Sequence, residues 1–290
     1  MITSVFALQS PLLAARDQGF FASEGINIQY VRTRSSREQS AALLSGEVDV
    51  VQTAADNVVA LATQRLNQAR VFHVADLGID QFALGSKSVS RLEDLRGRRV
   101  GVDAADSGYA FVLYKLLEDH GVGPGEYEVI EIGGPGGRYS SLLEGSSDIG
   151  LLNPHFADEA VSAGLPVLAE CADRFPLYPN LVFAATPEVD GDRHDELVAY
   201  ARAISAAVRW VNEPANTEQT IDLIQAESGI NRDKARMLYE KERELSTGIR
   251  PDAAATRASL QVITELRNDM TGQLVPVDDF VFPWVIASQS

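Results

Sequence analysis

A short motif occurs twice in this sequence and constrains the fold more than any other feature. Residues 43–50 read LLSGEVDV and residues 142–149 read LLEGSSDI, and their aspartates, Asp49 and Asp148, lie 99 positions apart. Each motif follows a short helical pattern and leads into an apolar run, with its glycine where a helix commonly ends in a left-handed residue. A helix–glycine–strand unit used twice predicts two similar α/β lobes. Paired lobes commonly form a cleft, and clefts bind small molecules.

Strand-like and helical patterns alternate along the first 190 residues. Ser10-Pro11 has the cap and proline of a helix start, and Ser35-x-x-Glu38 is a capping box. Short connections between alternating strands and helices predict an α/β fold of two doubly wound lobes around a cleft, each with a mostly parallel sheet. The glycine-rich stretch 133–137 is predicted to be a loop. The rest of the chain is predicted to be mainly helical, over 192–210, 216–228, 231–242 and 251–270.

Two short apolar segments bracket the second motif and suggest where the chain crosses between lobes. These are Phe82–Gly85 and Leu181–Thr186. We therefore expect lobe 1 to contain residues 1–83 and 184–290, and lobe 2 to contain residues 84–183.

The net charge limits the possible partners. With 41 acidic and 25 basic residues the chain carries a formal charge of −16, which disfavours nucleic acid and anionic membrane surfaces as partners. A small anionic ligand remains compatible, because local backbone dipoles can outweigh the global charge. No apolar run approaches the length of a membrane span, so no membrane insertion is expected. The N-terminal residues lack an export-signal pattern. The protein would be cytoplasmic if the chain is complete, and extracytoplasmic if an upstream signal was trimmed.

Three segments together resemble a known family. They are residues 10–28 (SPLLAARDQGFFASEGINI), 43–49 (LLSGEVD) and 92–102 (LEDLRGRRVGV). They are similar to solute-binding proteins for sulfonates, nitrate, taurine and thiamine-pyrimidine precursors, over about residues 3–245. The resemblance implies a type II periplasmic-binding-protein fold whose two lobes close on a ligand, and an ABC-type permease as partner if the protein is exported. The same fold also serves cytoplasmic desulfinases, decarboxylases and menaquinone-pathway proteins.

The candidate binding residues stand where predicted strands end and helices begin. Ligands of doubly wound sheets lie beyond the carboxyl ends of the strands, where helix N-termini offer N–H groups and partial positive charge. We predict that four such places face one shared cleft; their residues are Gln9 and Ser10; Thr53, Ala54, Asp56 and Asn57; Ser107, Gly108 and Tyr109; and Asn153 and His155.

Simpler roles remain open for several of these residues. Ser10, Asp56 and Asn153 could serve only as helix caps. If Asp56 faces the cleft, it favours a cationic or amine-bearing ligand; if it caps its own helix, its carboxylate is used locally. Tyr109 could stack on a planar ligand or belong to the core.

Signals for catalysis are weak. The four histidines show no metal-ligand spacing, so no metal site is expected, and the sequence suggests no cofactor. The single cysteine, Cys171, cannot supply the cysteine-rich motif of the pyrimidine-synthase branch, and it follows an apolar run typical of a buried, inert thiol. The desulfinase branch has a nucleophilic cysteine in its first lobe, where this chain reads Ala7-Leu-Gln-Ser10. His155 is the only histidine on a predicted cleft loop.

Two functions are therefore compatible with the sequence. The first is a non-catalytic binding protein of an ABC-type uptake system, for an organic anion that is sulfonate- or heterocycle-like. The alternative is a cytoplasmic enzyme on the same fold that acts on a small aromatic or heterocyclic acid, of decarboxylase, desulfinase or pyrimidine-synthesis type.

Overall fold

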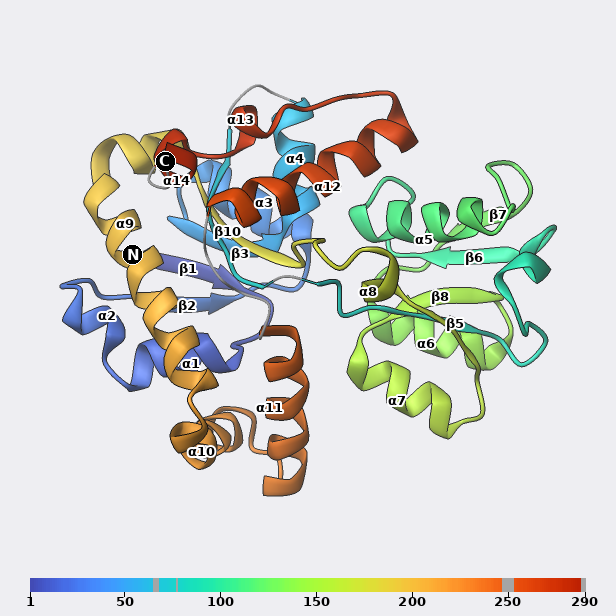
Figure 1. Cartoon of the computed structure of the whole chain (residues 1–290), viewed down its shortest axis with the longest axis horizontal. Coiled ribbons are helices and arrows are strands. Elements are labelled where there is room, and N and C mark those ends of the chain that lie inside the picture. The colour runs from blue at the N-terminus through green and yellow to red at the C-terminus, as the bar shows by residue number, and fades with distance from the viewer. Residues whose placement is uncertain (65–67, 77, 247–252, 288–290) are drawn as a thin grey trace. The chain divides into compact units, whose positions relative to one another are not determined.

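The chain forms two compact units, each built on its own five-stranded sheet (Figure 1). The computed structural model describes residues 1–64, 68–76, 78–246 and 253–287. Unit 1 comprises Met1–Leu77, Pro179–Gln261 and Val275–Ser290, and unit 2 comprises Gly78–Tyr178 and Val262–Leu274. Two separate mixed sheets confirm the predicted α/β class.

Unit 1 contains both ends of the chain. Its sheet has the strand order β2-β1-β3-β10-β4, in which β10 is antiparallel to both of its neighbours. Its elements are β1 (Ile2–Val5), α1 (Ser10–Asp17), α2 (Phe20–Ser23), β2 (Gln29–Arg32), α3 (Ser36–Ser45), β3 (Val50–Ala54), α4 (Ala55–Gln64), β4 (Arg70–Val74), β10 (Leu181–Ala185), α9 (Pro187–Asn212), η2 (Pro214–Asn216), α10 (Thr217–Ser228), α11 (Arg232–Ser246), α13 (Val277–Phe280) and α14 (Pro283–Ala287), and α12 (Ala253–Thr271) begins in this unit.

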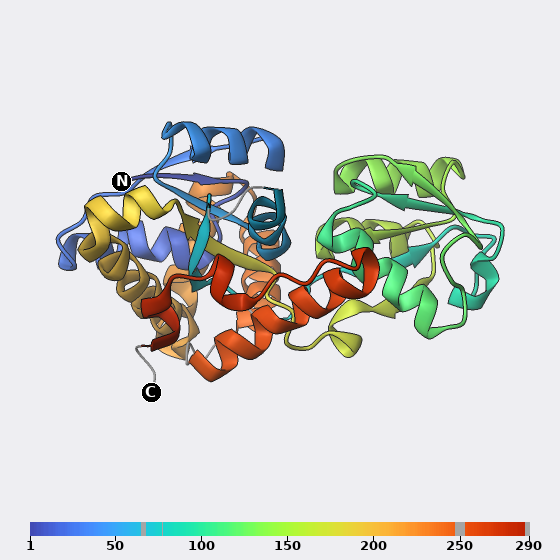
Figure 2. The same ribbon diagram turned by 90° about the horizontal axis from the view of Figure 1, so that it is seen from above.

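Unit 2 repeats this plan. Its sheet has the order β7-β6-β8-β5-β9, and here β5 is the strand antiparallel to both neighbours. Helices cover both faces of the sheet, with α5 on one face and α6 and α7 on the other (Figures 1 and 2). Its elements are β5 (Phe82–Gly85), η1 (Leu92–Leu95), β6 (Arg99–Val102), α5 (Gly108–Asp119), β7 (Glu128–Glu131), α6 (Pro135–Glu144), β8 (Ile149–Leu152), α7 (Pro154–Ser162), β9 (Val167–Glu170) and α8 (Cys171–Arg174).

The repeated motif performs the same structural task in both units. Its glycine ends α3 or α6 in the left-handed conformation, with φ of 76° at Gly46 and 71° at Gly145. Its aspartate then accepts a hydrogen bond from the first N–H of the neighbouring parallel strand. The N–O distances are 2.6 Å from Ile2 to Asp49 and 3.0 Å from Arg99 to Asp148. The motif thus aligns the central strands of each sheet.

The core of unit 1 is aromatic. The ring of Tyr200 on α9 packs against Phe21, Phe72 and Phe183, with centroid distances of 5.1, 5.6 and 5.4 Å. In unit 2 a leucine cluster fills the space between α6, α7 and the sheet; it includes Leu84, Leu142, Leu152 and Leu165. None of the helices within the described ranges is long and apolar enough to cross a membrane.

The structure corrects several details of the sequence interpretation. Phe82–Gly85 and Leu181–Ala185 are sheet strands, each paired on both sides, so the predicted lobe limits fall inside β5 and β10. Val262–Leu274 belongs to unit 2, where the Arg267 guanidinium lies 5.3 Å from the centre of the Phe111 ring.

Two local predictions also change. The stretch 133–137 is not wholly a loop, because Gly134 caps α6 and Pro135 begins it, as proline commonly does. A further short helical segment precedes the long helix predicted from residue 192: it begins at Pro187, capped by the Thr186 side chain, and non-helical backbone at Arg193 (φ −138°, ψ 34°) separates it from the long segment of α9. Residues 251 and 252 of the last predicted helix lie outside the described residues, and α12 is described from Ala253.

Candidate functional site

Three helices of unit 2 begin at one edge of its sheet. Strands β6, β7 and β8 are parallel neighbours, so their carboxyl ends meet at the same edge and lead into α5, α6 and α7. Ser107 Oγ caps α5 by accepting the Ala110 N–H at 3.1 Å, and Asn153 Oδ1 caps α7 by accepting the Phe156 N–H at 3.2 Å. This edge therefore concentrates helix N-termini, which favour negative charge.

A buried arginine lies at the same edge. Arg138 on α6 is 4% exposed, and its Nε donates to the Leu151 carbonyl at 2.8 Å while Nη1 donates to the Gly133 carbonyl at 2.5 Å. Within the described chain no carboxylate forms an ion pair with it. Burial lowers the pKa of Arg138, and the nearby Asp103 opposes this shift. Two backbone carbonyls thus hold the guanidinium in place, and the negative charge of Asp103 lies nearby.

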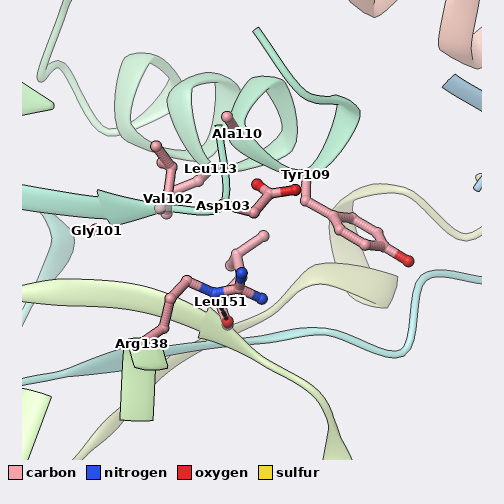
Figure 3. A pocket seen from close by; sticks show the side chains of 8 residues that line it. All are labelled: Gly101, Val102, Asp103, Tyr109, Ala110, Leu113, Arg138 and Leu151. Atoms are coloured by element: carbon pink, nitrogen blue, oxygen red, sulfur yellow. Dashed lines mark hydrogen bonds between the residues drawn. The ribbon is translucent and has the colours of Figure 1, made fainter. Parts of the chain in front are cut away.

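Asp103 and Tyr109 complete a small pocket around Arg138. Asp103 Oδ1 accepts a hydrogen bond from Ser107 Oγ at 2.5 Å, so the cap of α5 is tied to the end of β6. Figure 3 shows the guanidinium directed toward the Asp103 carboxylate, with the Tyr109 ring to one side. The pocket is lined by Gly101, Val102, Asp103, Tyr109, Ala110, Leu113, Arg138 and Leu151.

The corresponding edge of unit 1 is closed by polar contacts within the chain. Gln52 Nε2 donates to Gln9 Oε1 at 3.0 Å, and Asn57 Nδ2 donates to Thr53 Oγ1 at 2.9 Å. Asp56, in the first turn of α4, is 3% exposed. Both alternatives for Asp56, a helix cap and a ligand contact, stay predictions.

Glu242 of α11 occupies the start of α1. Its Oε2 accepts the Ser10 N–H at 2.9 Å, across 232 residues of sequence. The Leu12 and Leu13 N–H groups both donate hydrogen bonds to the Gln9 carbonyl, at 2.9 and 3.1 Å, and Pro11 has no N–H. The Ser10 amide is therefore the one first-turn donor not bonded to Gln9, and a side-chain carboxylate already holds it. Burial raises the pKa of Glu242, although hydrogen bonds from Ser10 oppose this.

The structure groups the predicted residues by unit. The unit 1 set, Gln9, Ser10, Thr53, Ala54, Asp56 and Asn57, lies around the ends of β1 and β3. The unit 2 set, Ser107, Gly108, Tyr109, Asn153 and His155, lies at the starts of α5 and α7. The side chain of His155 is 62% exposed and lies 3.5 Å from Glu159. The prediction that all of them face one shared cleft stays a prediction.

Sequence reasoning missed Arg138, Asp103 and Glu242. The sequence did contain a signal for Arg138. The two copies of the repeated motif are 99 residues apart, and the same offset aligns Arg138 with Gln39, which is buried. Gln39 Nε2 donates to the Gln52 carbonyl at 3.0 Å, just as Arg138 Nε donates to Leu151. No sequence pattern connects Glu242 with α1, because their contact is made only by the tertiary fold.

Two further kinds of site, a reactive cysteine and a metal centre, are also considered. Cys171 is fully buried, and burial raises the pKa of its thiol. In the part of the chain that the structure describes, no group of three or more His, Cys, Asp or Glu side chains could hold a metal ion.

Comparison with known proteins identifies the family. A family described as NMT1/THI5 like matches residues 9–217. The chain belongs to this family. The match confirms the resemblance drawn from the sequence. A search of curated proteins found no match.

Solved structures share the fold. A ligand-binding component of an ABC-type import system from Staphylococcus aureus, with zinc bound, has a TM-score of 0.76 and 17% identity, covering 100% of this chain and 98% of its own. The alkanesulfonate-binding protein SsuA from Xanthomonas axonopodis pv. citri, bound to MOPS, has a TM-score of 0.74 and 14% identity, covering 96% and 95%. A DszB mutant in complex with biphenyl-2-sulfinic acid has a TM-score of 0.67 and 17% identity, covering 99% and 98%. The chain has the periplasmic-binding-protein fold.

Proposed function

We propose that this chain is a non-catalytic binding protein of an ABC-type uptake system, and that its ligand is an organic anion of sulfonate or heterocyclic-acid type. The observation that carries the proposal is Arg138, a buried guanidinium without an ion pair in the described chain. A buried charge is costly unless something pairs with it. An anionic ligand group supplies that partner, and the three helix starts at the same edge add favourable dipoles.

The other pocket residues add selectivity. Two of the Arg138 nitrogens are held by backbone carbonyls, so the guanidinium presents a fixed face to the ligand. Asp103 lies beside it and accepts hydrogen bonds, which suits a ligand with a donor next to its anionic group. The Tyr109 ring at the side of the pocket suits a planar ligand portion (Figure 3).

The comparisons support the transport role. Two proteins with this fold are described as an ABC import component and as an alkanesulfonate-binding protein. If this protein is exported, its partner is an ABC-type permease that receives the ligand. The similarity to DszB, solved with a sulfinic acid, supports the alternative of an enzyme acting on a small aromatic acid more weakly.

Calorimetric titration tests the proposal. The panel contains nitrate, sulfate, alkanesulfonates, aromatic carboxylates and heterocyclic acids. For any compound that binds, Arg138→Gln should weaken affinity at least about tenfold, since a hydrogen bond to a charged group contributes about 1.5 to 3 kcal/mol. Glutamine is the matched choice, because Gln39 makes the equivalent backbone contact in unit 1.

The control is Arg91→Gln, at an exposed arginine of the same unit. It should leave affinity unchanged. Binding that survives Arg138→Gln without loss, or a panel in which no anion binds, would contradict the proposal. The enzyme alternative requires a product that accumulates with time, so each bound compound is recovered after incubation and examined for chemical change.

A further inference from the structure

Of the three described helix starts at the binding edge of unit 2, only that of α6 has no side-chain cap. Ser107 caps α5 and Asn153 caps α7, whereas the N-cap of α6 is Gly134, which has no side chain to accept a hydrogen bond. Within the described chain the N–H groups of Gly136 and Gly137 donate to no acceptor. Two first-turn donors of α6 are therefore open to a bound group.

The equivalent helix start in unit 1 is filled by two side chains. The 99-residue offset of the repeat aligns Gly134 with Ser35. It also aligns Gly137 with Glu38. Ser35 Oγ accepts the Glu38 N–H at 3.1 Å, and Glu38 Oε2 accepts the Arg34 N–H at 3.2 Å, so a hydroxyl and a carboxylate occupy the start of α3. In unit 2 glycine replaces both residues, so the start of α6 is open where the start of α3 is closed.

The Arg138 guanidinium lies beside this open start. Arg138 is the fourth residue of α6, and its Nη1 reaches back to the carbonyl of Gly133, the residue before the N-cap. A side chain that leans toward the helix N-terminus in this way brings its charge close to the N–H groups of the first turn. Arg138 is only 4% exposed, yet its Nη2 donates to no group in the described chain. The same guanidinium lines the pocket of unit 2 (Figure 3).

We propose that the N–H groups of Gly136 and Gly137 bind the anionic group of the ligand together with Arg138 Nη2. This inference rests on the proposed function and adds the donors that hold the oxygens of a sulfonate or carboxylate. Gly137 is exposed and Gly136 is partly exposed, so this turn is open to solvent. Open N–H groups at a helix start favour an anion both as donors and through the helix dipole. Glycine at position 134 leaves out a hydroxyl that would occupy a first-turn N–H, and glycine at position 137 leaves out a carboxylate that would repel the ligand.

Restoring the missing cap tests this role. Gly134→Ser rebuilds in unit 2 the cap that Ser35 forms in unit 1, and Gly134→Ala adds the same Cβ without the oxygen. A Cβ at Gly134 meets nothing within 4 Å beyond its chain neighbours, and the φ of −59° suits any residue, so both variants should fold. Calorimetry measures the affinity of each variant for butane-1-sulfonate and for benzoate, and thermal unfolding measures the melting temperatures.

Stability and affinity should change in opposite directions between the two variants. Gly134→Ser should melt at a higher temperature than Gly134→Ala, because its hydroxyl caps α6. It should also bind the probe more weakly than Gly134→Ala, by about fivefold or more, because the ligand must displace the new cap. A helix start without a role in binding would give the higher melting temperature with equal affinities.

Amide resonances give a second test in the native protein. During titration with butane-1-sulfonate, the amide proton resonances of Gly136 and Gly137 should shift downfield until the site is saturated, and Arg138→Gln should reduce the shift. The inference is overturned if the two Gly134 variants bind equally, if bound probe leaves both resonances in place, or if neither probe binds the native protein. In each case an anion of the wider panel whose affinity falls in Arg138→Gln would leave the proposed function intact. A panel in which no anion binds would instead contradict the proposed function.

Discussion

Unit 1 and unit 2 share a strand order but carry opposite charges where their helices begin. In both sheets three parallel strands are followed by a strand antiparallel to its two neighbours. In both, the motif aspartate accepts the first N–H of the adjacent strand. Yet the edge of unit 2 holds the cation Arg138, and the edge of unit 1 holds the carboxylate Glu242.

One pair of equivalent positions shows how the difference arises. Gln39 and Arg138 each lie seven residues before the glycine that ends their helix, and each donates to the equivalent carbonyl, of Gln52 or Leu151. The backbone task is the same, and only the second side chain carries a charge. The backbone contact is thus common to both units, while the charge at this position depends on which side chain makes the contact.

The largest expected effect is a loss of stability at acid pH, which should affect unit 1 more than unit 2. His73 on β4 is buried, its Nε2 has no hydrogen-bond partner in the described chain, and burial lowers its pKa to about 4. The unfolded chain therefore binds more protons than the native one between about pH 6.5 and 4. Stability should fall as the pH drops through this window, by at most about 3 kcal/mol.

Native-state hydrogen exchange measures this loss in each unit. The strands of unit 1 should lose protection as the pH falls, while those of unit 2, whose His120 and His155 are exposed, should not. His73→Gln is the control and should flatten the pH dependence of urea unfolding in the same window. A slope that is unchanged in His73→Gln would show that another group is responsible.

The next effect compares the two equivalent helix positions. Gln39→Leu removes an amide that donates to the Ser4 and Gln52 carbonyls, both at 3.0 Å, and should cost about 2 kcal/mol. Arg138→Leu also removes two backbone contacts, but it relieves the buried charge, so its cost should be smaller. Urea unfolding of both variants measures the difference. A larger loss for Arg138→Leu would mean that the guanidinium is chiefly structural.

A smaller difference is expected between the motif aspartates. Asp148 has a side chain 7% exposed and pairs with Arg99, whereas the Asp49 side chain is 24% exposed and pairs with Arg193. Burial raises the pKa of Asp148, but hydrogen bonds and the positive charge of Arg99 lower it by more. The net pKa therefore lies below the ordinary value of an aspartate. Asp148→Ala should therefore cost about 2 kcal/mol and Asp49→Ala about 1 kcal/mol at neutral pH.

The pH dependence checks the assignment for Asp148. A carboxyl group whose pKa is lower in the folded state stabilises the protein above its unfolded pKa of about 3.9. That contribution should disappear as the pH falls through the lower folded value. If Asp148→Ala and the native protein differ equally at neutral and strongly acidic pH, the ionised carboxylate is not what stabilises this strand pair.

These pairs also show how much of the fold was readable from the sequence. The motif predicted the helix ends at Gly46 and Gly145 correctly, because glycine is strongly favoured where φ is positive. The roles of Phe82–Gly85 and Leu181–Ala185 were not readable. An apolar run of four or five residues fits a linker, an edge strand or a central strand equally well, and only pairing on both sides decides among them.

The candidate site was readable only in part. Helix starts such as Ser107 and Asn153 have local cap signals, and the structure confirms both caps. Arg138 was hidden by the glycines before it, which suggested a loop. Glu242 reaches Ser10 across 232 residues, and no local rule predicts such a contact.

The smallest effects are expected at the two residues that could have suggested catalysis. In a binding protein no side chain has to transfer a proton or form a covalent bond, so His155→Ala and Cys171→Ser should each change ligand affinity by no more than about 1 kcal/mol. Cys171 is buried with a raised pKa, which keeps its thiol protonated, and His155 is exposed beside Glu159. Loss of a general acid–base group would instead slow a reaction about a hundredfold or more.

The measurement is calorimetry with a panel compound that binds, followed by recovery of that compound after long incubation. A product that forms with the native protein and disappears in His155→Ala would replace the binding role with the enzyme alternative.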